Sequence, residues 1–149
     1  MGTDDAAILD PALPCARRGG RGEAVLIVDV PPLSDIRARH GAGAAEQARR
    51  TVSDCLRRRL RPEDRIAPVR SDGFLAVLPG ADDAALAAIA ERIRSGVRGL
   101  RLSVGGDAWP LDCAVGGAAR AARALCLEGL VRAADGALAR ERRARPAPV

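Results

Sequence analysis

The chain of 149 residues contains no lysine, no asparagine and no tyrosine, and its only aromatic residues are Phe74 and Trp109. Proteins that bind single-stranded nucleic acid by base stacking need aromatic rings on one face, so nucleic-acid binding of that kind is not expected. All 24 basic residues are arginines, and the formal net charge is +5. A GC-rich codon bias accounts for most of them. Arginine nevertheless binds phosphate and guanine edges bidentately, which suits an anionic nucleotide partner.

The four cysteines show no C-x-x-C or Cys/His spacing, so neither a zinc site nor a disulfide framework is expected. The first ten residues lack the basic start and apolar run of a secretory signal, and no apolar stretch has the length of a membrane span. We therefore expect a cytoplasmic protein. Its length and its 48% hydrophobic content predict one globular domain.

Apolar periodicity and turn residues predict the elements. Residues 1–22, rich in proline, glycine and charge, predict a loose arm. The remaining pattern predicts a strand at 24–30, helices at 33–40 and 44–60, strands at 65–69 and 74–78, a helix at 81–97, a hairpin of strands 100–104 and 111–115, and a helix at 128–143. The order β-α-α-β-β-α-β-β-α places the chain in the α/β (α+β) class, with a mixed sheet surrounded by helices, close to the ferredoxin-like plan.

Several short sequence segments occur in an order and spacing typical of one domain family. Asp29 follows the first strand, Gly41 comes twelve residues later, and Arg70–Phe74 forms a turn between two strands. Together with the strings Ala90–Arg94 and Leu130–Leu138, they resemble the GGDEF domain, the catalytic domain of diguanylate cyclases. The resemblance covers residues 23–145 and leaves 146–149 as a tail. It implies a GGDEF-like fold with a ferredoxin-like central sheet.

Such cyclases join two GTP molecules held on two facing domains, with a metal ion that polarises the phosphates. The resemblance implies that Asp29 and Asp72 would be the metal ligands, since hard cations near phosphate take oxygen ligands. The alternative is structural: Asp29 caps a strand-to-helix turn, and Asp72 makes the hairpin turn. No cofactor is expected to be required, and Mg²⁺ matters only if residual GTP binding persists.

The resemblance also shows where the signature has degenerated. The two signature glycines, which let the backbone approach the nucleotide, are replaced by larger residues. The acid in the fourth place is lost, and so is the second acid after the first strand. We therefore expect negligible cyclase activity. The altered or retained positions are Pro31, Arg37 (a guanine-reading Asn), Glu46 (a guanine-reading Asp), Arg70 and Ser71 (the glycines), Gly73 (the fourth-place Glu) and Arg142 (a phosphate-binding Lys).

In the same family an R-x-x-D motif five residues before the hairpin is an inhibitory site for the product, cyclic di-GMP. Arg61 and Asp64 stand in that register, and Arg92 stands where a further arginine often helps. Chance alone gives about two R-x-x-D matches in so arginine-rich a chain, and 132–135 is another. The resemblance implies that Arg61 contacts guanine O6 and N7 and that Asp64 accepts from the base. Alternatively, residues 62–64 are a simple turn and Arg61 caps a helix.

Three functions remain open. The first is a non-catalytic cyclic di-GMP receptor that signals through a protein partner or a homodimer. The second is an interaction module that binds no nucleotide, and the third is a weak residual cyclase that uses GTP and Mg²⁺. Nucleic-acid binding through arginines is a weaker fourth, which a steep salt dependence would reveal.

Overall fold

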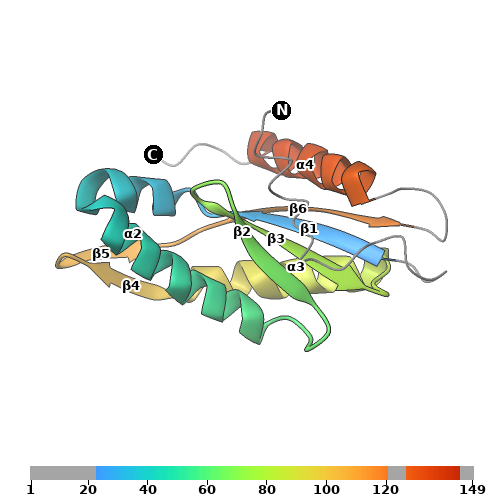
Figure 1. Ribbon diagram of the computed structural model, residues 1–149, viewed down its shortest axis with the longest axis horizontal. Helices are drawn as coiled ribbons and strands as arrows, with labels where there is room; N and C mark the ends of the chain where they lie inside the picture. Colours follow the sequence, from blue (N-terminus) through green and yellow to red (C-terminus); the bar gives the residue numbers. More distant parts are fainter. Residues whose placement is uncertain (1–22, 121–126, 145–149) are drawn as a thin grey trace.

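The structure is a computed structural model that describes residues 23–120 and 127–144. Its centre is a four-stranded sheet in the order β2-β3-β1-β6 (Figure 1). The strands are β1 (Glu23–Asp29), β2 (Arg65–Val69), β3 (Gly73–Pro79) and β6 (Ala114–Arg120). The predicted arm and tail lie outside the described residues.

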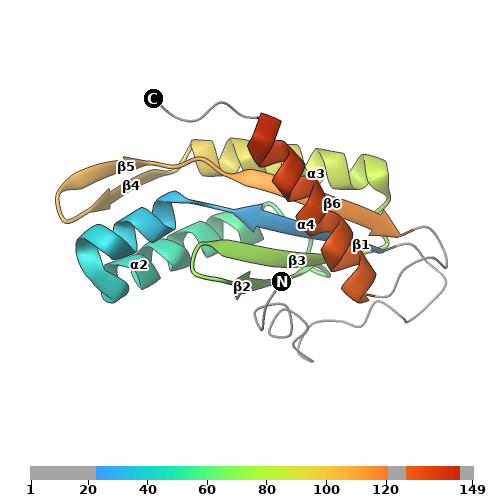
Figure 2. The same cartoon turned by 90° about the horizontal axis from the view of Figure 1, so that it is seen from above.

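Helices cover both faces of the sheet (Figure 2). They are α2 (Pro32–Arg58), α3 (Asp83–Arg98) and α4 (Leu127–Ala144). Helices α2 and α3 pack on the face that carries Leu26 and Val28, whereas α4 packs on the face that carries Val25 and Ile27. Because both faces are covered, β1 is apolar without alternation, which is why it reads as a continuous hydrophobic run.

Local signals in the sequence fix the limits of the helices. Gly41 interrupts α2 with a φ of 89° and a ψ of 175°, which confirms the predicted break between two helical segments. Asp82 precedes α3, and its side chain accepts a hydrogen bond of 2.8 Å from the backbone N–H of Ala85. This is an N-cap, which satisfies one of the unpaired donors in the first turn of a helix.

The α/β class and the central sheet are confirmed, but two details differ from prediction. Every described pairing in the sheet is antiparallel, rather than mixed. The hairpin prediction was wrong in its second strand: β4 (Arg101–Val104) pairs with β5 (Asp107–Pro110), not with 111–115. Gly105 and Gly106 both have positive φ and form a two-residue turn, so the second strand begins directly at Asp107. The residues that follow Cys113 instead begin β6 of the main sheet.

Among residues 23–120 and 127–144, no helix combines the length and the apolar character that crossing a membrane requires.

Candidate functional site

Two carboxylates meet where β1 ends and the β2–β3 turn begins. Asp29 is the last residue of β1 and pairs in register with Gly73, while the backbone N–H of Val30 donates to the carbonyl oxygen of Asp72 at 2.7 Å. Asp29 is buried. Burial and the neighbouring charge of Asp72 raise the pKa of Asp29, and Arg142 opposes the rise. The structure therefore brings the two predicted acids together.

Each carboxylate already has a partner. The guanidinium of Arg142, on α4, donates to Oδ2 of Asp29, and Ser34 Oγ donates to Oδ2 of Asp72 at 2.9 Å. Mg²⁺ is commonly held by one or two carboxylates together with substrate phosphates, so this donor set could accept one. No group of three or more His, Cys, Asp or Glu side chains suited to a metal occurs among the described residues. A metal at Asp29 would compete with the Arg142 guanidinium.

Arginines hold the turn between β2 and β3 in place. Arg70 has a φ of 58°, a left-handed conformation that suits glycine and is costly for arginine. Its side chain turns toward α4 and donates to both carboxylate oxygens of Asp135, at 3.2 and 3.1 Å. Arg49, on α2, donates to the carbonyl oxygens of Arg70 at 3.2 Å and Ser71 at 2.8 Å. The hairpin is thus tied to a helix on each side of the sheet.

Gly73 is buried in a space that is tight for a larger residue. A Cβ atom built on it would lie 3.1 Å from the carbonyl oxygen of Val69 and 3.2 Å from that of Val28. Both atoms belong to paired strands and cannot move independently. The acid that the family carries at this position would therefore need the backbone to shift.

The two positions where the resemblance implied guanine readers stand apart from the carboxylate pair. Arg37 is exposed, and Glu46 is exposed and forms an ion pair of 3.8 Å with Arg50 on the next turn of α2. No contact among the described residues joins either to Asp29 or Asp72. The two carboxylates form one cluster with Arg142 and Ser34, and the hydroxyl of Ser71 lies 3.4 Å from that of Ser34. The other two positions are separate from this cluster.

Arg61 and Asp64 form a closed local pair in the loop between α2 and β2. Asp64 accepts from the backbone N–H of Arg61 at 2.8 Å, from its Nε at 3.2 Å and from one terminal nitrogen at 2.8 Å. The same nitrogen donates to the carbonyl oxygen of Pro79 at 3.0 Å. The Asp64 side chain is fully buried, whereas that of Arg61 is 33% exposed. In this arrangement Asp64 positions Arg61 and is not itself open to a base.

A cavity of about 320 Å³ lies beside this pair. Such a volume is at the lower end of the range for small-molecule sites. Arg92 is exposed on α3 and is not among the residues that line the cavity. The lining residues are Arg57, Leu60, Arg61, Pro62, Asp64, Arg65 and Ile66.

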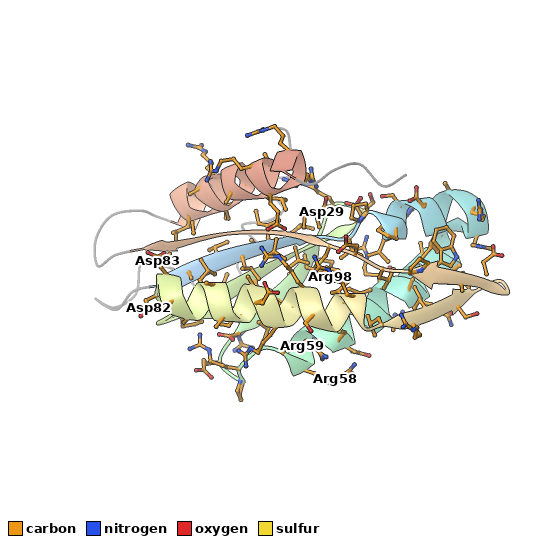
Figure 3. All side chains as sticks on the ribbon, turned by 180° about the vertical axis from the view of Figure 1, so that it is seen from behind. Asp29, Arg58, Arg59, Asp82, Asp83 and Arg98 are labelled. Atoms are coloured by element: carbon orange, nitrogen blue, oxygen red, sulfur yellow. The ribbon has the colours of Figure 1, made fainter. Side chains whose placement is uncertain are left out.

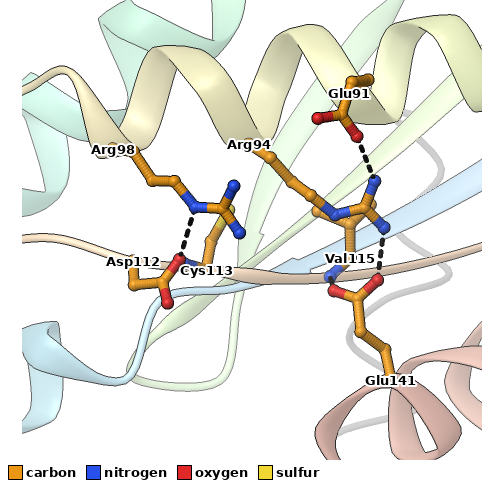
Figure 4. A network of polar contacts seen from close by, with 7 residues as sticks. All are labelled: Glu91, Arg94, Arg98, Asp112, Cys113, Val115 and Glu141. Atoms are coloured by element: carbon orange, nitrogen blue, oxygen red, sulfur yellow. Dashed lines mark hydrogen bonds and ion pairs between the residues drawn. The ribbon is translucent and has the colours of Figure 1, made fainter. Parts of the chain in front are cut away.

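Some residues of these sites carried no signal in the sequence. Figure 3 shows Arg58 and Arg59 where α2 ends, beside α3; Gly96 of α3 leaves room for Arg59. Glu141, on α4, pairs with Arg94 of α3 and accepts from the backbone N–H of Val115 at 2.6 Å (Figure 4). The spacing of these residues in the sequence does not indicate such contacts. Asp135 belongs to the second R-x-x-D match, and its partner is Arg70.

The family model "Diguanylate cyclase, GGDEF domain" matches residues 6–146. No curated protein matches the chain by sequence. Among solved structures, an EAL/GGDEF domain protein from M. capsulatus is 25% identical with a TM-score of 0.75, over 85% of this chain and 82% of that one. The GGDEF domain of DgcB from Caulobacter crescentus, in complex with c-di-GMP, is 20% identical with a TM-score of 0.75, over 94% and 80%.

The diguanylate cyclase SiaD from Pseudomonas aeruginosa, in complex with its activator SiaC, is 22% identical with a TM-score of 0.76. The match covers 87% of this chain but only 49% of SiaD, so the chain spans about half of that protein. The match of the family model to nearly the whole sequence and the agreement of the folds lead to one conclusion: the chain belongs to the GGDEF domain family.

Proposed function

We propose that this GGDEF domain is a non-catalytic receptor for cyclic di-GMP, which binds the dinucleotide at Arg61 and signals through a protein partner or a second copy of the chain. The observation that carries the proposal is the Arg61–Asp64 pair, formed beside a cavity and in register with the signature hairpin. The DgcB domain, which has the same fold, was solved with this dinucleotide bound.

The arrangement of Arg61 suggests how it would contact a guanine. Its Nε and one terminal nitrogen are held by Asp64 and the carbonyl of Pro79, so that edge of the guanidinium is occupied. The flat face stays available, and arginine stacks well on planar rings. Asp64 would then fix the guanidinium plane rather than read the base. Direct recognition by Asp64 would require the ion pair to open.

Arg92 supports a role for a second copy. Because it is exposed and does not line the cavity, it is available to reach a ligand across a contact between chains. A dimer of this kind would let ligand binding change the assembly. Size measurement with and without the dinucleotide tests that part of the proposal.

Absence of catalysis rests on four features of the carboxylate site. Arg142 pairs with Asp29, and Arg70 is bound to Asp135 in place of a signature glycine. Gly73 stands in a tight space in place of the fourth acid, and Pro31 replaces the second acid. Formation of cyclic di-GMP from GTP and Mg²⁺ by the purified protein, lost in Asp72→Ala, would contradict this conclusion.

A second candidate is an interaction module that binds no nucleotide. It is favoured by one observation: every oxygen of Asp64 is satisfied within the chain, as in a purely structural turn. SiaD shows that a diguanylate cyclase of this family can be bound by another protein. An interaction module would keep its partner but give no heat and no thermal shift with cyclic di-GMP or GTP.

Calorimetric titration with cyclic di-GMP separates the two candidates. The receptor predicts saturable binding that Arg61→Ala weakens by about tenfold or more, as expected for loss of a stacked or charge-assisted contact. Arg132→Ala is the control, because Arg132 is an exposed arginine of the other R-x-x-D match. Binding that is equal in wild type, Arg61→Ala and Arg132→Ala would rule out this site.

A further inference from the structure

We propose that Arg57 and Arg65, rather than Arg61, supply the positive charge that neutralises the phosphates of the ligand in the Arg61 cavity. The inference rests on the proposed function and assigns two further residues to its site. In this proposal the flat face of the Arg61 guanidinium stacks on a base, and the two flanking arginines contact the phosphodiester groups.

The positive charge of Arg61 is offset by two neighbouring carboxylates. Its guanidinium lies 2.8 Å from the carboxylate of Asp64 and 3.6 Å from that of Glu63. These two carboxylates outweigh its single positive charge, so the cluster of Arg61, Glu63 and Asp64 is net negative. A phosphate approaching Arg61 alone would meet no excess of positive charge.

Two other arginines, Arg57 and Arg65, flank the cavity. Arg57 lies in the last turn of α2 and Arg65 is the first residue of β2, and both line the cavity. Both are exposed, and neither side chain has a hydrogen bond or ion pair among the described residues. Their charges are therefore free to act on a ligand. Two positive charges match the two phosphodiesters of a cyclic dinucleotide, and arginine binds phosphate through a planar fork.

The simpler explanation is that Arg57 stabilises the C-terminal end of a helix, where the partial negative charge favours a cation. Arg58 separates the two explanations. It is the neighbouring arginine of the same last turn and is also exposed, but it does not line the cavity. If these arginines only stabilised the C-terminal end of the helix, Arg57 and Arg58 would contribute alike. A contact with the ligand phosphate is expected of Arg57 alone.

The test is calorimetric titration of cyclic di-GMP into wild type and the variants Arg57→Ala, Arg65→Ala, Arg58→Ala and Arg61→Ala at low and high salt. We expect Arg57→Ala and Arg65→Ala each to weaken binding about tenfold at low salt and less at high salt, because salt screens exposed charges. Arg58→Ala should stay within about twofold of wild type, since Arg58 does not line the cavity and charges that interact through water do so weakly. Arg61→Ala should weaken binding at both salt concentrations.

The outcomes are distinguishable. Wild type that gives no binding overturns the proposed function and this inference with it. Binding lost in Arg61→Ala but unchanged in Arg57→Ala and Arg65→Ala keeps the receptor and overturns the charge assignment. An equal loss in Arg57→Ala, Arg65→Ala and Arg58→Ala also overturns it, because the effect would then be one of overall charge. Thermal unfolding of each variant shows whether it is folded during the titration.

Discussion

Arg142, near the end of α4, donates to the Asp29 carboxylate at the end of β1, across 113 positions of sequence. The contact joins the last helix of the domain to the edge of the sheet where the two retained acids meet. A guanidinium thus supplies positive charge where, by resemblance, the family would use a metal ion. The Asp29 carboxylate therefore has a structural partner within the chain.

Removing this guanidinium should destabilise the protein and expose the acids to other cations. We expect Arg142→Ala to lower the free energy of unfolding by about 1 kcal/mol, because Asp29 is buried but Arg142 is half exposed. Magnesium should raise the melting temperature of Arg142→Ala but not that of wild type. Arg143→Ala, which removes the adjacent exposed arginine, is the control. An equal magnesium response in wild type and Arg142→Ala would contradict competition at Asp29.

Asp29 should make the free energy of unfolding depend on pH, in a direction that its raised pKa determines. Burial and the charge of Asp72 raise its pKa in the folded state above the ordinary value of 3.8. Between these two values the folded state binds more protons than the unfolded state, so the contribution of Asp29 to stability falls as pH rises. Asp29→Asn should therefore gain stability relative to wild type as pH rises through this window. Denaturant titrations with a chelator present measure the difference, and a constant or falling difference would refute the assignment.

Substituting Arg70 by glycine should have two opposing effects on stability. Arg70→Gly loses an ion pair but relieves the left-handed backbone, each worth about 1 kcal/mol, so the variant should be nearly as stable as wild type. In an Asp135→Ala background the ion pair is already gone, and Arg70→Gly should then stabilise by about 1 kcal/mol. The double-mutant cycle is measured by denaturant unfolding. Additive effects would mean that the two side chains are not coupled.

A side chain at Gly73 should destabilise the protein, whereas one at Gly43 should not. We expect Gly73→Ala to cost about 1–3 kcal/mol, because the new Cβ meets two strand carbonyls. Gly43 lies within α2 with open space around its missing Cβ, so Gly43→Ala should stabilise by about 0.5–1 kcal/mol. Gly73→Glu, which restores the acid of the family, should for the same reason fail to restore cyclase activity. A stable Gly73→Glu variant that makes cyclic di-GMP would overturn this reasoning.

The sequence was most informative where the contacts are local. The break at Gly41 and the turn before Phe74 both follow from residues within a few positions of one another. The ion pair between Arg61 and Asp64 is equally local, but the sequence did not predict that the two side chains contact each other. The partners of Arg70 and Arg142 could not be predicted, because they depend on where α4 crosses the sheet. The hairpin error has a local cause: the sequence marked the turn at residues 105–107 but did not show that two glycines alone would close it.

The most direct test of the central claim is one titration of the full chain with cyclic di-GMP, beside Arg61→Ala and the control Arg132→Ala, read by calorimetry and by particle size. We expect saturable binding in wild type and Arg132→Ala, a loss of about tenfold or more in Arg61→Ala, and no product from GTP in any of them. Absence of binding in wild type, or binding that Arg61→Ala leaves unchanged, would contradict the central claim.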